Sequence, residues 1–211
     1  MISILDYDAG NIKSVEKALQ YLGSEAVITN DRDTISNSDG LILPGVGAFG
    51  DAMEKIKSRK LDSIIEEFVS TGKPFLGICL GLQLLFKESE ESPGAIGLGL
   101  LDGKIIKIPS DYPDGTHLKV PQIGWNSIKI NPASKLLEGI PDESYFYFVH
   151  SFYLQADNIS DVAATTEYGV TVHAAVERGN IMATQFHPEK SSDVGLNVLK
   201  NYISMTEGGN K

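Results

Sequence analysis

The sequence predicts an α/β fold: a three-layer domain with a mostly parallel sheet, flanking helices and an antiparallel β-rich extension. In the first half of the chain, short apolar runs alternate with amphipathic helical patterns, which is typical of βαβ units. In residues 100–186, short β-rich runs are separated by Gly, Pro, Asn and Asp, the usual residues of turns. A chain of 211 residues can bury one large core, so we expect a single domain spanning residues 1–211.

The first half supplies the parallel strands and their crossover helices. The apolar run Ile2–Leu5 predicts the first strand. Apolar residues then recur at intervals of three and four between positions 12 and 22 and stop before Gly23, which predicts an amphipathic helix with a glycine just beyond its end. The elements expected next are, in order, strands at 26–28 and 41–43, a helix at 61–69, a strand at 75–78, a helix at 79–86 and a polar connection at 89–99.

The second half supplies the antiparallel extension and a closing helix. Its β-rich runs predict strands at 104–108, 145–149, 162–166 and 181–186. Helical periodicity returns after Ser191 and predicts a helix over 194–203, followed by a frayed tail at 206–211.

Composition excludes several kinds of partner. The 18 Lys and Arg against 28 Asp and Glu give a net charge of −10, and no basic run exceeds two residues, so we expect neither nucleic acid nor an anionic membrane as a partner. Cys79 is the single cysteine, which rules out an internal disulfide and a thiolate metal cluster. The histidine spacing fits no metal site, and the first residues resemble neither a signal peptide nor an anchor. We expect a cytoplasmic protein without a metal or cofactor.

The most informative segment is Gly77-Ile78-Cys79-Leu80-Gly81, between an expected strand and an expected helix. This is the layout of a nucleophile elbow with cysteine in place of serine, in which small residues two positions either side let the turn close. The start of a helix favours the thiolate, and the amide of Leu80 is placed to donate to an oxyanion. An isolated cysteine is more often an inert buried residue. The two glycines and the strand-helix context nevertheless indicate that Cys79 is a nucleophile.

A thiol nucleophile requires a base, and His187 is the strongest candidate among the four histidines. It lies in Gln185-Phe186-His187-Pro188-Glu189, where the proline favours an extended conformation for the residue before it. Residues i and i+2 of an extended chain lie on one face, so we expect Glu189 beside the imidazole as the third member of a triad. We expect His150 and His173 to make structural hydrogen bonds.

A second glycine motif suggests a different function. Residues 45–50 read GVGAFG, which fits the G-x-G-x-x-G fingerprint of dinucleotide-binding oxidoreductases, with Glu66 and Glu67 further along. However, the motif follows the third expected strand rather than the first, Pro44 disturbs the strand end, and a dehydrogenase would leave the cysteine elbow unexplained. We therefore interpret the segment as a flexible backbone that presents an amide to the oxyanion from the side opposite Leu80.

Three motifs together resemble a known family. Residues 44–47, 77–83 and 186–189 read PGVG, GICLGLQ and FHPE, and in this order they resemble the signatures of class I, triad-type glutamine amidotransferases. Finer features resemble the glutaminase subunits of imidazole glycerol phosphate synthases: Leu82, Asp6-Tyr7, Gly10-Asn11, Gly124-Trp125-Asn126, Phe148-Val149-His150-Ser151 and Lys190-Ser191. The resemblance extends from residue 2 to about 204.

The resemblance implies an activity and a partner. Glutamine would be hydrolysed to glutamate and ammonia, and the ammonia would pass through a channel to a (β/α)₈ cyclase subunit that forms imidazole glycerol phosphate and AICAR in histidine biosynthesis. The two subunits would form a heterodimer. In the family, one oxyanion amide is misoriented until the partner's ligand binds, so a free subunit would be nearly inactive.

The resemblance also implies roles for individual residues. Cys79 would be the nucleophile, His187 the base and then the acid, and Glu189 the orienting carboxylate. The remaining roles would be the oxyanion-hole amides of Leu80 and Val46, the glutamine contacts Gln83, Gly47 and Ser151, and the partner contacts Asn11, Trp125, Tyr147 and Lys190. Two positions depart from the family: Asp8 replaces a common glycine, and Phe152 replaces a common tyrosine.

Other functions remain open at this point. A glutaminase of this type could serve another synthase, in anthranilate or guanylate formation or in surface-sugar amidination. Leu82, the 124–126 motif and Lys190 argue against the first two, whereas the sugar case stays open. A non-catalytic binding subunit is disfavoured by the intact Cys79, His187 and Glu189.

Overall fold

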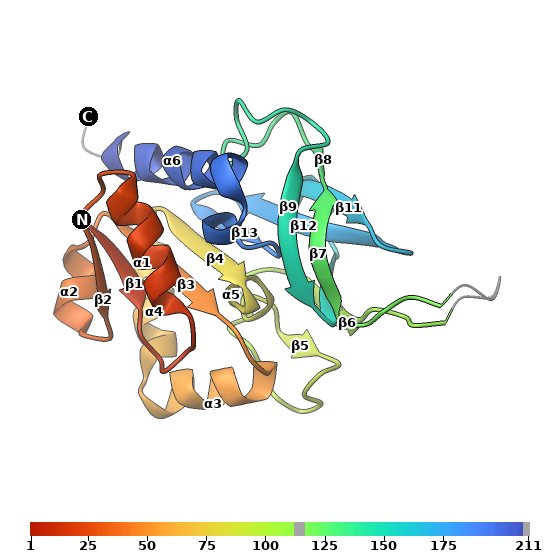
Figure 1. Cartoon of the computed structure of the whole chain (residues 1–211). Helices are drawn as coiled ribbons and strands as arrows, with labels where there is room; N and C mark the ends of the chain where they lie inside the picture. The colour runs from red at the N-terminus through yellow and green to blue at the C-terminus, as the bar shows by residue number, and fades with distance from the viewer. Residues whose placement is uncertain (112–116, 209–211) are drawn as a thin grey trace.

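The computed structural model describes residues 1–111 and 117–208, and within them the main feature is an eight-stranded sheet with helices on both faces (Figure 1). The strand order is β2-β1-β3-β4-β13-β12-β11-β8. The first five strands run parallel, and the last three pair antiparallel. The predicted α/β fold with its antiparallel extension is therefore confirmed.

The elements of the first half build the parallel part of the sheet and its helical layers. In chain order they are β1 (Ile2–Leu5), α1 (Ile12–Tyr21), β2 (Ala26–Thr29), α2 (Arg32–Asn37), β3 (Gly40–Gly45), α3 (Phe49–Ser58), α4 (Leu61–Ser70), β4 (Phe75–Cys79), α5 (Leu80–Gln83) and β5 (Glu88–Ser89).

The elements of the second half are mostly strands. In chain order they are β6 (Gly103–Lys107), β7 (Gln122–Ser127), β8 (Lys129–Ile130), β9 (Tyr145–His150), β10 (Phe152–Ala156), η1 (Ile159–Asp161), β11 (Val162–Glu167), β12 (Thr171–Arg178), β13 (Ile181–Thr184), η2 (Pro188–Lys190) and α6 (Ser192–Gly208). The antiparallel ribbon β7–β9 and the small sheet β10-β6-β5 stand apart from the main sheet.

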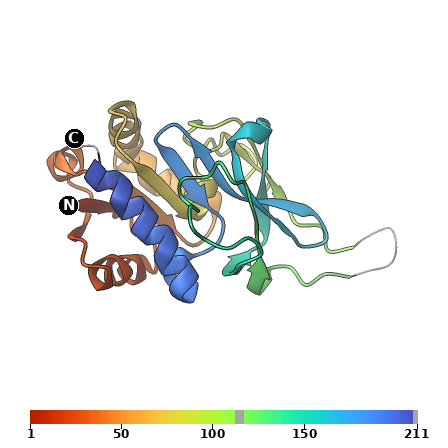
Figure 2. The same cartoon turned by 90° about the horizontal axis from the view of Figure 1, so that it is seen from above.

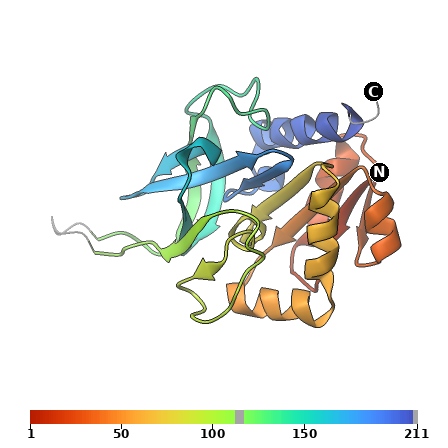
Figure 3. The same cartoon turned by 180° about the vertical axis from the view of Figure 1, so that it is seen from behind.

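The three layers follow from strands that are apolar on both faces. Strands β1, β3, β4 and β13 are buried along their whole lengths. Figure 2 shows α1 and α6 on one side of the sheet, and Figure 3 shows α4 crossing the other side. Alternate residues of β3 divide accordingly: Ile42 belongs to the core with α1 and α6, whereas Leu41 and Leu43 belong to the core with α2, α3 and α4.

The first helix ends as its sequence predicts. Gly23 has a left-handed φ of 81°, its N–H donates to Gln20 O at 2.9 Å, and the N–H of Ser24 donates to Leu19 O at 3.0 Å. This pair of bonds is a Schellman motif, which satisfies the last carbonyls of the helix.

Several elements differ from the expectations. The expected helix at 79–86 stops at Gln83, and the closing helix starts at Ser192 and continues to Gly208. Thr206 in the expected frayed tail is buried and bonds Ile203 O at 2.7 Å, while residues 209–211 lie outside the described residues.

Helices α2 and α3 and strands β5, β7, β8, β10 and β12 were not predicted. The sequence of α2 does contain a helix-start residue that could have predicted it: the N-cap Asp31, whose carboxylate accepts a hydrogen bond from Thr34 N at 2.8 Å. In residues 1–111 and 117–208, no helix has the length and apolar character needed to cross a bilayer.

Candidate active site

Cys79 lies at the carboxyl end of β4, where the chain turns sharply into α5. Its φ of 55° and ψ of −107° are strained for a residue with a side chain. A Cβ on Gly77 would lie 2.8 Å from Gly81 O, and one on Gly81 would lie 1.8 Å from Leu43 O. Only glycine fits at both positions, so the backbone has the geometry of a nucleophile elbow.

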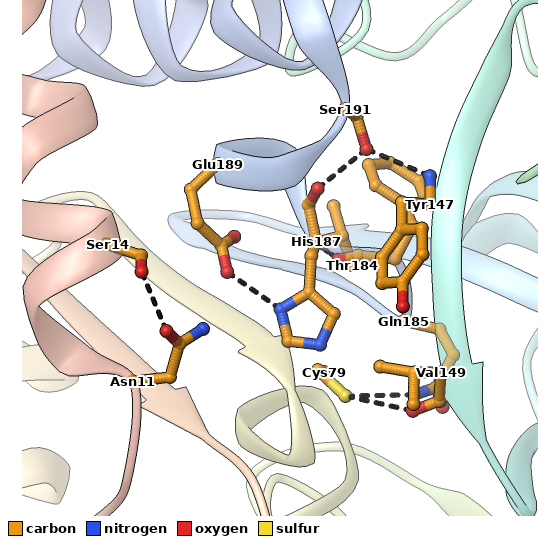
Figure 4. Close-up of polar contacts among 11 residues, drawn as sticks. Asn11, Ser14, Cys79, Tyr147, Val149, Thr184, Gln185, His187, Glu189 and Ser191 are labelled. Atoms are coloured by element: carbon orange, nitrogen blue, oxygen red, sulfur yellow. Dashed lines mark hydrogen bonds and ion pairs between the residues drawn. The ribbon is translucent and has the colours of Figure 1, made fainter. Parts of the chain in front are cut away.

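His187 and Glu189 form a buried pair beside Cys79. Their side chains are each 2% exposed, and Nδ1 of the imidazole lies 2.8 Å from Glu189 Oε1. Nε2 makes no hydrogen bond with the described residues, and the imidazole faces the Cys79 sulfur (Figure 4). Burial alone would lower the pKa of His187, but the neighbouring sulfur and the Glu189 carboxylate raise it to about 9. Both neighbours therefore favour the protonated form of the imidazole.

The backbone of His187 is fixed to the β7–β9 ribbon. Its N–H donates to Tyr147 O at 3.0 Å, while Ser191 Oγ donates to His187 O at 2.6 Å and accepts from Tyr147 N at 3.0 Å. His187 itself is extended, as the following proline predicts, with φ −98° and ψ 101°. The expectation that Glu189 continues the extended chain is wrong, because Pro188–Lys190 forms a 3₁₀ turn that brings the carboxylate to Nδ1.

A cavity of about 270 Å³ opens beside Cys79. It is lined by residues from several separate segments: Val46, Gly47, Cys79, Leu80, Gln83, Glu91, Pro121, Val149, His150, Ser151 and Phe152. The structure thus brings together, around the sulfur, every residue expected to contact the oxyanion or glutamine. His187 reaches the sulfur without lining this cavity.

Two backbone segments flank the cavity where an oxyanion would form. Leu80 is the first residue of α5, and the first N–H groups of a helix lack intrahelical partners. Across the cavity, Gly47 has a φ of 107°, which favours glycine, and a Cβ there would meet open space. The predicted flexible segment 45–50 is in fact short, because Gly45 ends β3 and α3 begins at Phe49.

Three buried or cavity-lining residues were missed by the sequence analysis. Glu91 lines the cavity and accepts from Phe49 N at 2.8 Å, where α3 begins. Ser191 links His187 to β9. Gln185 is fully buried and contacts both the Cys79 sulfur and Gln83. The spacing of Gln185 and His187 could have indicated that Gln185 faces the site, since residues two apart in an extended chain lie on the same face.

The two departures from the family pattern have local explanations. The carboxylate of Asp8, which has a left-handed φ of 63°, pairs with Arg59 on the surface. Phe152 contributes its carbonyl to the site, because Gln83 Nε2 donates to Phe152 O at 3.0 Å. This contact does not require the hydroxyl of a tyrosine.

The residues expected to meet a partner fall into two groups. Trp125 and Tyr147 are neighbours on the β7–β9 ribbon, with their ring centroids 6.2 Å apart, and Lys190 Nζ lies 5.9 Å from the Tyr147 ring centroid. Asn11 lies on the other side of Glu189, with a left-handed φ of 67°, and its Oδ1 accepts from Ser14 Oγ at 2.7 Å (Figure 4). Trp125 is 52% exposed.

The pKa values of buried His150 and half-buried His173 are both lowered. Burial lowers the pKa of His150 to about 4, while its Nδ1 lies 2.9 Å from Phe152 O and its Nε2 lies 3.0 Å from Gln122 Oε1. Burial also lowers the pKa of His173, whose Nδ1 accepts from Ala156 N at 3.0 Å. In the part of the chain that the structure describes, no cluster of acidic, His or Cys side chains could hold a metal ion.

A larger hollow lies elsewhere. It has a volume of about 630 Å³ and lies between β5, β6 and residues 93–96, with no cysteine or histidine among its lining residues. Chemistry at a nucleophile therefore belongs to the smaller cavity at Cys79.

Comparison with known proteins is consistent across sequence and structure. The sequence profile of the family described as glutamine amidotransferase class-I matches residues 3–204. The "Imidazole glycerol phosphate synthase subunit HisH" of Geobacillus sp. (strain WCH70) is 48% identical over 208 residues, covering 99% of this chain and 98% of that protein. The protein of the same name from Methanothermobacter thermautotrophicus is 49% identical, covering 97% of this chain and 98% of that protein.

Solved structures share the fold at lower sequence identity. The "Structure of PurLQS from Thermotoga maritima" contains a chain that superimposes with a TM-score of 0.75 at 18% identity, covering 96% of this chain and 97% of that chain. At that identity the likeness concerns the fold alone.

Proposed function

The chain belongs to the class I glutamine amidotransferases, and on that premise we propose that it hydrolyses L-glutamine as the glutaminase subunit of an imidazole glycerol phosphate synthase. One observation carries the activity. The strained Cys79 elbow faces the buried His187–Glu189 pair at the edge of a cavity of about 270 Å³. The relatives' names support the choice of synthase.

The chemistry follows from this arrangement. The Cys79 thiolate attacks the side-chain carboxamide carbon of glutamine and forms a tetrahedral oxyanion. The imidazolium of His187 gives its Nε2 proton to the leaving nitrogen, ammonia departs, and a thioester remains. The now neutral imidazole takes a proton from water, which attacks the thioester, and glutamate departs as the thiolate and the imidazolium are restored. Glu189 holds the imidazole in place through Nδ1 and stabilises its charged form.

The cavity offers groups suited to the rest of the substrate. Its lining includes the Glu91 carboxylate, whose negative charge suits the α-ammonium group of L-glutamine. Gln83, Gly47 and Ser151 line the same cavity and supply amide, backbone and hydroxyl groups. We assign the substrate's amino-acid end to Glu91 and its carboxamide end to the Cys79 side.

The oxyanion site supplies a place for control. The amides of Leu80 and Val46 would bind the oxyanion, and the segment at Val46 and Gly47 is the one able to reorient, since Gly47 has space around it and an unusual φ. Loss of one oxyanion donor costs about 100- to 1,000-fold in kcat. A free subunit with this amide misdirected would be nearly silent.

The partner would be a (β/α)₈ cyclase subunit, and the two chains would form a cytoplasmic heterodimer. This chain would contribute a single domain to it. The face we assign to it carries Trp125, Tyr147 and Lys190 on one side of the triad and Asn11 on the other. Tyr147 also holds the His187 backbone through two main-chain contacts, one direct and one through Ser191. The partner face and the catalytic base are therefore joined by one strand.

The proposal is tested with the full chain and a candidate cyclase. Glutamate release from glutamine is measured for the chain alone, for the complex, and for the complex with the cyclase's phosphorylated ligand. We expect negligible turnover alone and an increase of about two to three orders of magnitude in the liganded complex. High turnover of the free chain would contradict the switch, and silence under all conditions would contradict the partner or the triad.

A variant separates the two half-reactions. Cys79→Ala is expected to abolish glutamine-dependent product formation by the complex while leaving ammonia-dependent synthesis intact, because the cyclase does not use the thiol. Product formation is followed with glutamine or with ammonium salts as the nitrogen source. Parallel loss of both activities would contradict the assigned role of Cys79.

A further inference from the structure

Gln185 is a fully buried amide that lies between the nucleophile and Gln83. Its Nε2 donates to the Cys79 sulfur at 3.7 Å, and its Oε1 accepts from Gln83 Nε2 at 3.1 Å. Gln185 directly follows β13, and its backbone N–H donates to Ala174 O at 2.8 Å, which fixes its main chain beside β12. None of the roles assigned so far uses this side chain.

We propose that Gln185 is an N–H donor to the Cys79 thiolate, held in its donating orientation by Gln83. In this role it would stabilise the charged nucleophile before attack and again when the thioester is cleaved. The proposal rests on Cys79 being the nucleophile of the proposed function.

The orientation of the amide follows from its neighbours. Gln83 Nε2 also donates to Phe152 O at 3.0 Å, and a backbone carbonyl can only accept, so this atom of Gln83 must be the nitrogen. The atom of Gln185 that faces Gln83 must therefore be its oxygen, which leaves the amide nitrogen of Gln185 facing the sulfur. Reversing Gln185 would place two donors against each other.

The Cys79 sulfur needs such a donor because its other neighbour, a backbone carbonyl, favours the thiol over the thiolate. Cys79 Sγ lies 3.9 Å from Val149 O, to which only the protonated thiol can donate. When the proton moves from Sγ to Nε2 of His187, the carbonyl faces an anion, whereas the Gln185 N–H forms a charge-assisted bond with it. The Gln185 N–H thus stabilises the thiolate and offsets the preference of Val149 O for the thiol.

The experiment is the pH dependence of Cys79 alkylation by iodoacetamide in the full-length chain. Cys79 is the single cysteine, so the reaction rate reports this thiol alone. The pH of half-maximal rate is expected to rise by about one unit in Gln185→Leu, a tenfold loss of thiolate at a given lower pH. Gln185→Glu keeps the shape and the acceptor for Gln83 but loses the donor, so it should raise the midpoint at least as much.

Gln122→Leu is the matched control. It removes another buried amide, one that contacts His150 and not the sulfur, and it should leave the alkylation midpoint unchanged. Folding of each variant is checked by its thermal transition. Unchanged midpoints in both folded Gln185 variants would overturn the proposal, as would an equal shift in Gln122→Leu.

A measurement on the unsubstituted residue covers the case in which the Gln185 variants do not fold. In ¹⁵N-labelled chain, one glutamine side-chain amide should shift with the thiol titration and should not shift in Cys79→Ala. Absence of such an amide would overturn the proposal. Both readouts follow the thiol itself, so they remain valid if glutamine proves not to be the substrate.

A kinetic comparison adds a further readout. In the active complex, Gln185→Glu should lower kcat about tenfold with a smaller change in KM, because the sulfur loses a donor while Gln83 keeps its acceptor. Gln83→Met should raise KM and also lower kcat, since Gln83 lines the cavity and holds the Gln185 amide in its donating orientation. A Gln185→Glu effect confined to KM would contradict donation to the nucleophile.

Discussion

His187 shows how a few buried contacts set the state of one residue. The sulfur and the Glu189 carboxylate outweigh the effect of burial and raise the pKa of His187 to about 9, whereas burial, together with the nearby His187, lowers the pKa of His150 to about 4. The same site thus raises the pKa of one imidazole and lowers the pKa of the other. In the proposed reaction His187 gives a proton to the leaving group, whereas His150 lines the cavity.

The charge on His187 predicts a pH dependence. Glutaminase kcat/KM in the active complex should fall as pH rises through about 9, because the imidazolium loses the proton that the leaving nitrogen requires. In Glu189→Gln the falling limb should move to lower pH, since a carboxylate bond that raises this pKa is lost. Rates measured between pH 6 and 10 check this; an unmoved limb would contradict the role of Glu189. His187→Asn should lose more activity than Glu189→Gln.

Neutral His150 predicts a loss of stability in acid. The unfolded chain takes up this proton near the ordinary pKa of 6.5, whereas the folded chain takes it up only near 4. The stabilisation is therefore complete above about pH 6.5 and is lost as pH falls to about 4, a change of about 3 kcal/mol. Urea unfolding at several pH values should show this slope, and it should be smaller in His150→Gln. An equal slope in the variant would contradict the assignment.

At the scale of elements, the β4–α5 elbow depends on close backbone packing. Gly81 allows α5 to approach β3 so closely that an added Cβ would overlap Leu43 O, and Gly77 allows the same strand-helix approach from the other side. The strained φ of Cys79 is maintained by these contacts. The nucleophile's position is therefore a property of three elements, β3, β4 and α5.

Gly81→Ala is expected to be strongly destabilising. A Cβ 1.8 Å from Leu43 O forces α5 or β3 to move, which costs about 1–3 kcal/mol or more and displaces Cys79. The thermal midpoint and glutaminase activity of the complex are measured together. Gly208→Ala, at the exposed end of α6 with open space around it, is the control and should stay within about 1 kcal/mol of the unsubstituted chain. Similar behaviour of the two variants would contradict the packing argument.

At the scale of the whole molecule, the β7–β9 ribbon connects an exposed surface to the His187 segment. Ile123, Trp125 and Tyr145 are large exposed apolar side chains on this ribbon, and Tyr147 in the same ribbon bonds the His187 segment. Exposed apolar clusters often mark protein–protein contacts. Under the proposed function, this cluster is the face that the cyclase would cover.

Trp125→Ala is expected to weaken binding of the cyclase about 30-fold, which corresponds to about 2 kcal/mol for a central aromatic contact. Binding is measured by titration calorimetry with the purified cyclase. Tyr21→Ala is the matched control, because Tyr21 is an aromatic side chain, 79% exposed, at the end of α1 and away from the ribbon. Equal losses in both variants, or none in Trp125→Ala, would contradict the assigned face.

Much of the fold could be predicted because it depends on local patterns. The alternation of apolar runs and amphipathic helices predicted α1, α4 and the central parallel strands, and Gly23 predicted the end of α1. Strand β12 was missed although it pairs with its chain neighbours β11 and β13, whereas the ribbon strand β7 pairs with β9 across an intervening segment. Helix 79–86 was predicted too long because the apolar residues after Gln83 are buried by tertiary contacts in a turn.

The sequence by itself determined the family, because the elbow glycines, the cysteine and the His-Pro-Glu segment each form a recognisable pattern of a few neighbouring residues. Only the tertiary structure decided how distant groups meet: the 3₁₀ turn that aims Glu189, the charge of His187, Glu91 in the cavity and Gln185 on the sulfur. Burial and electrostatic interactions depend on residues about a hundred positions apart in the chain, as Cys79 and Gln185 are, and no local pattern records that proximity.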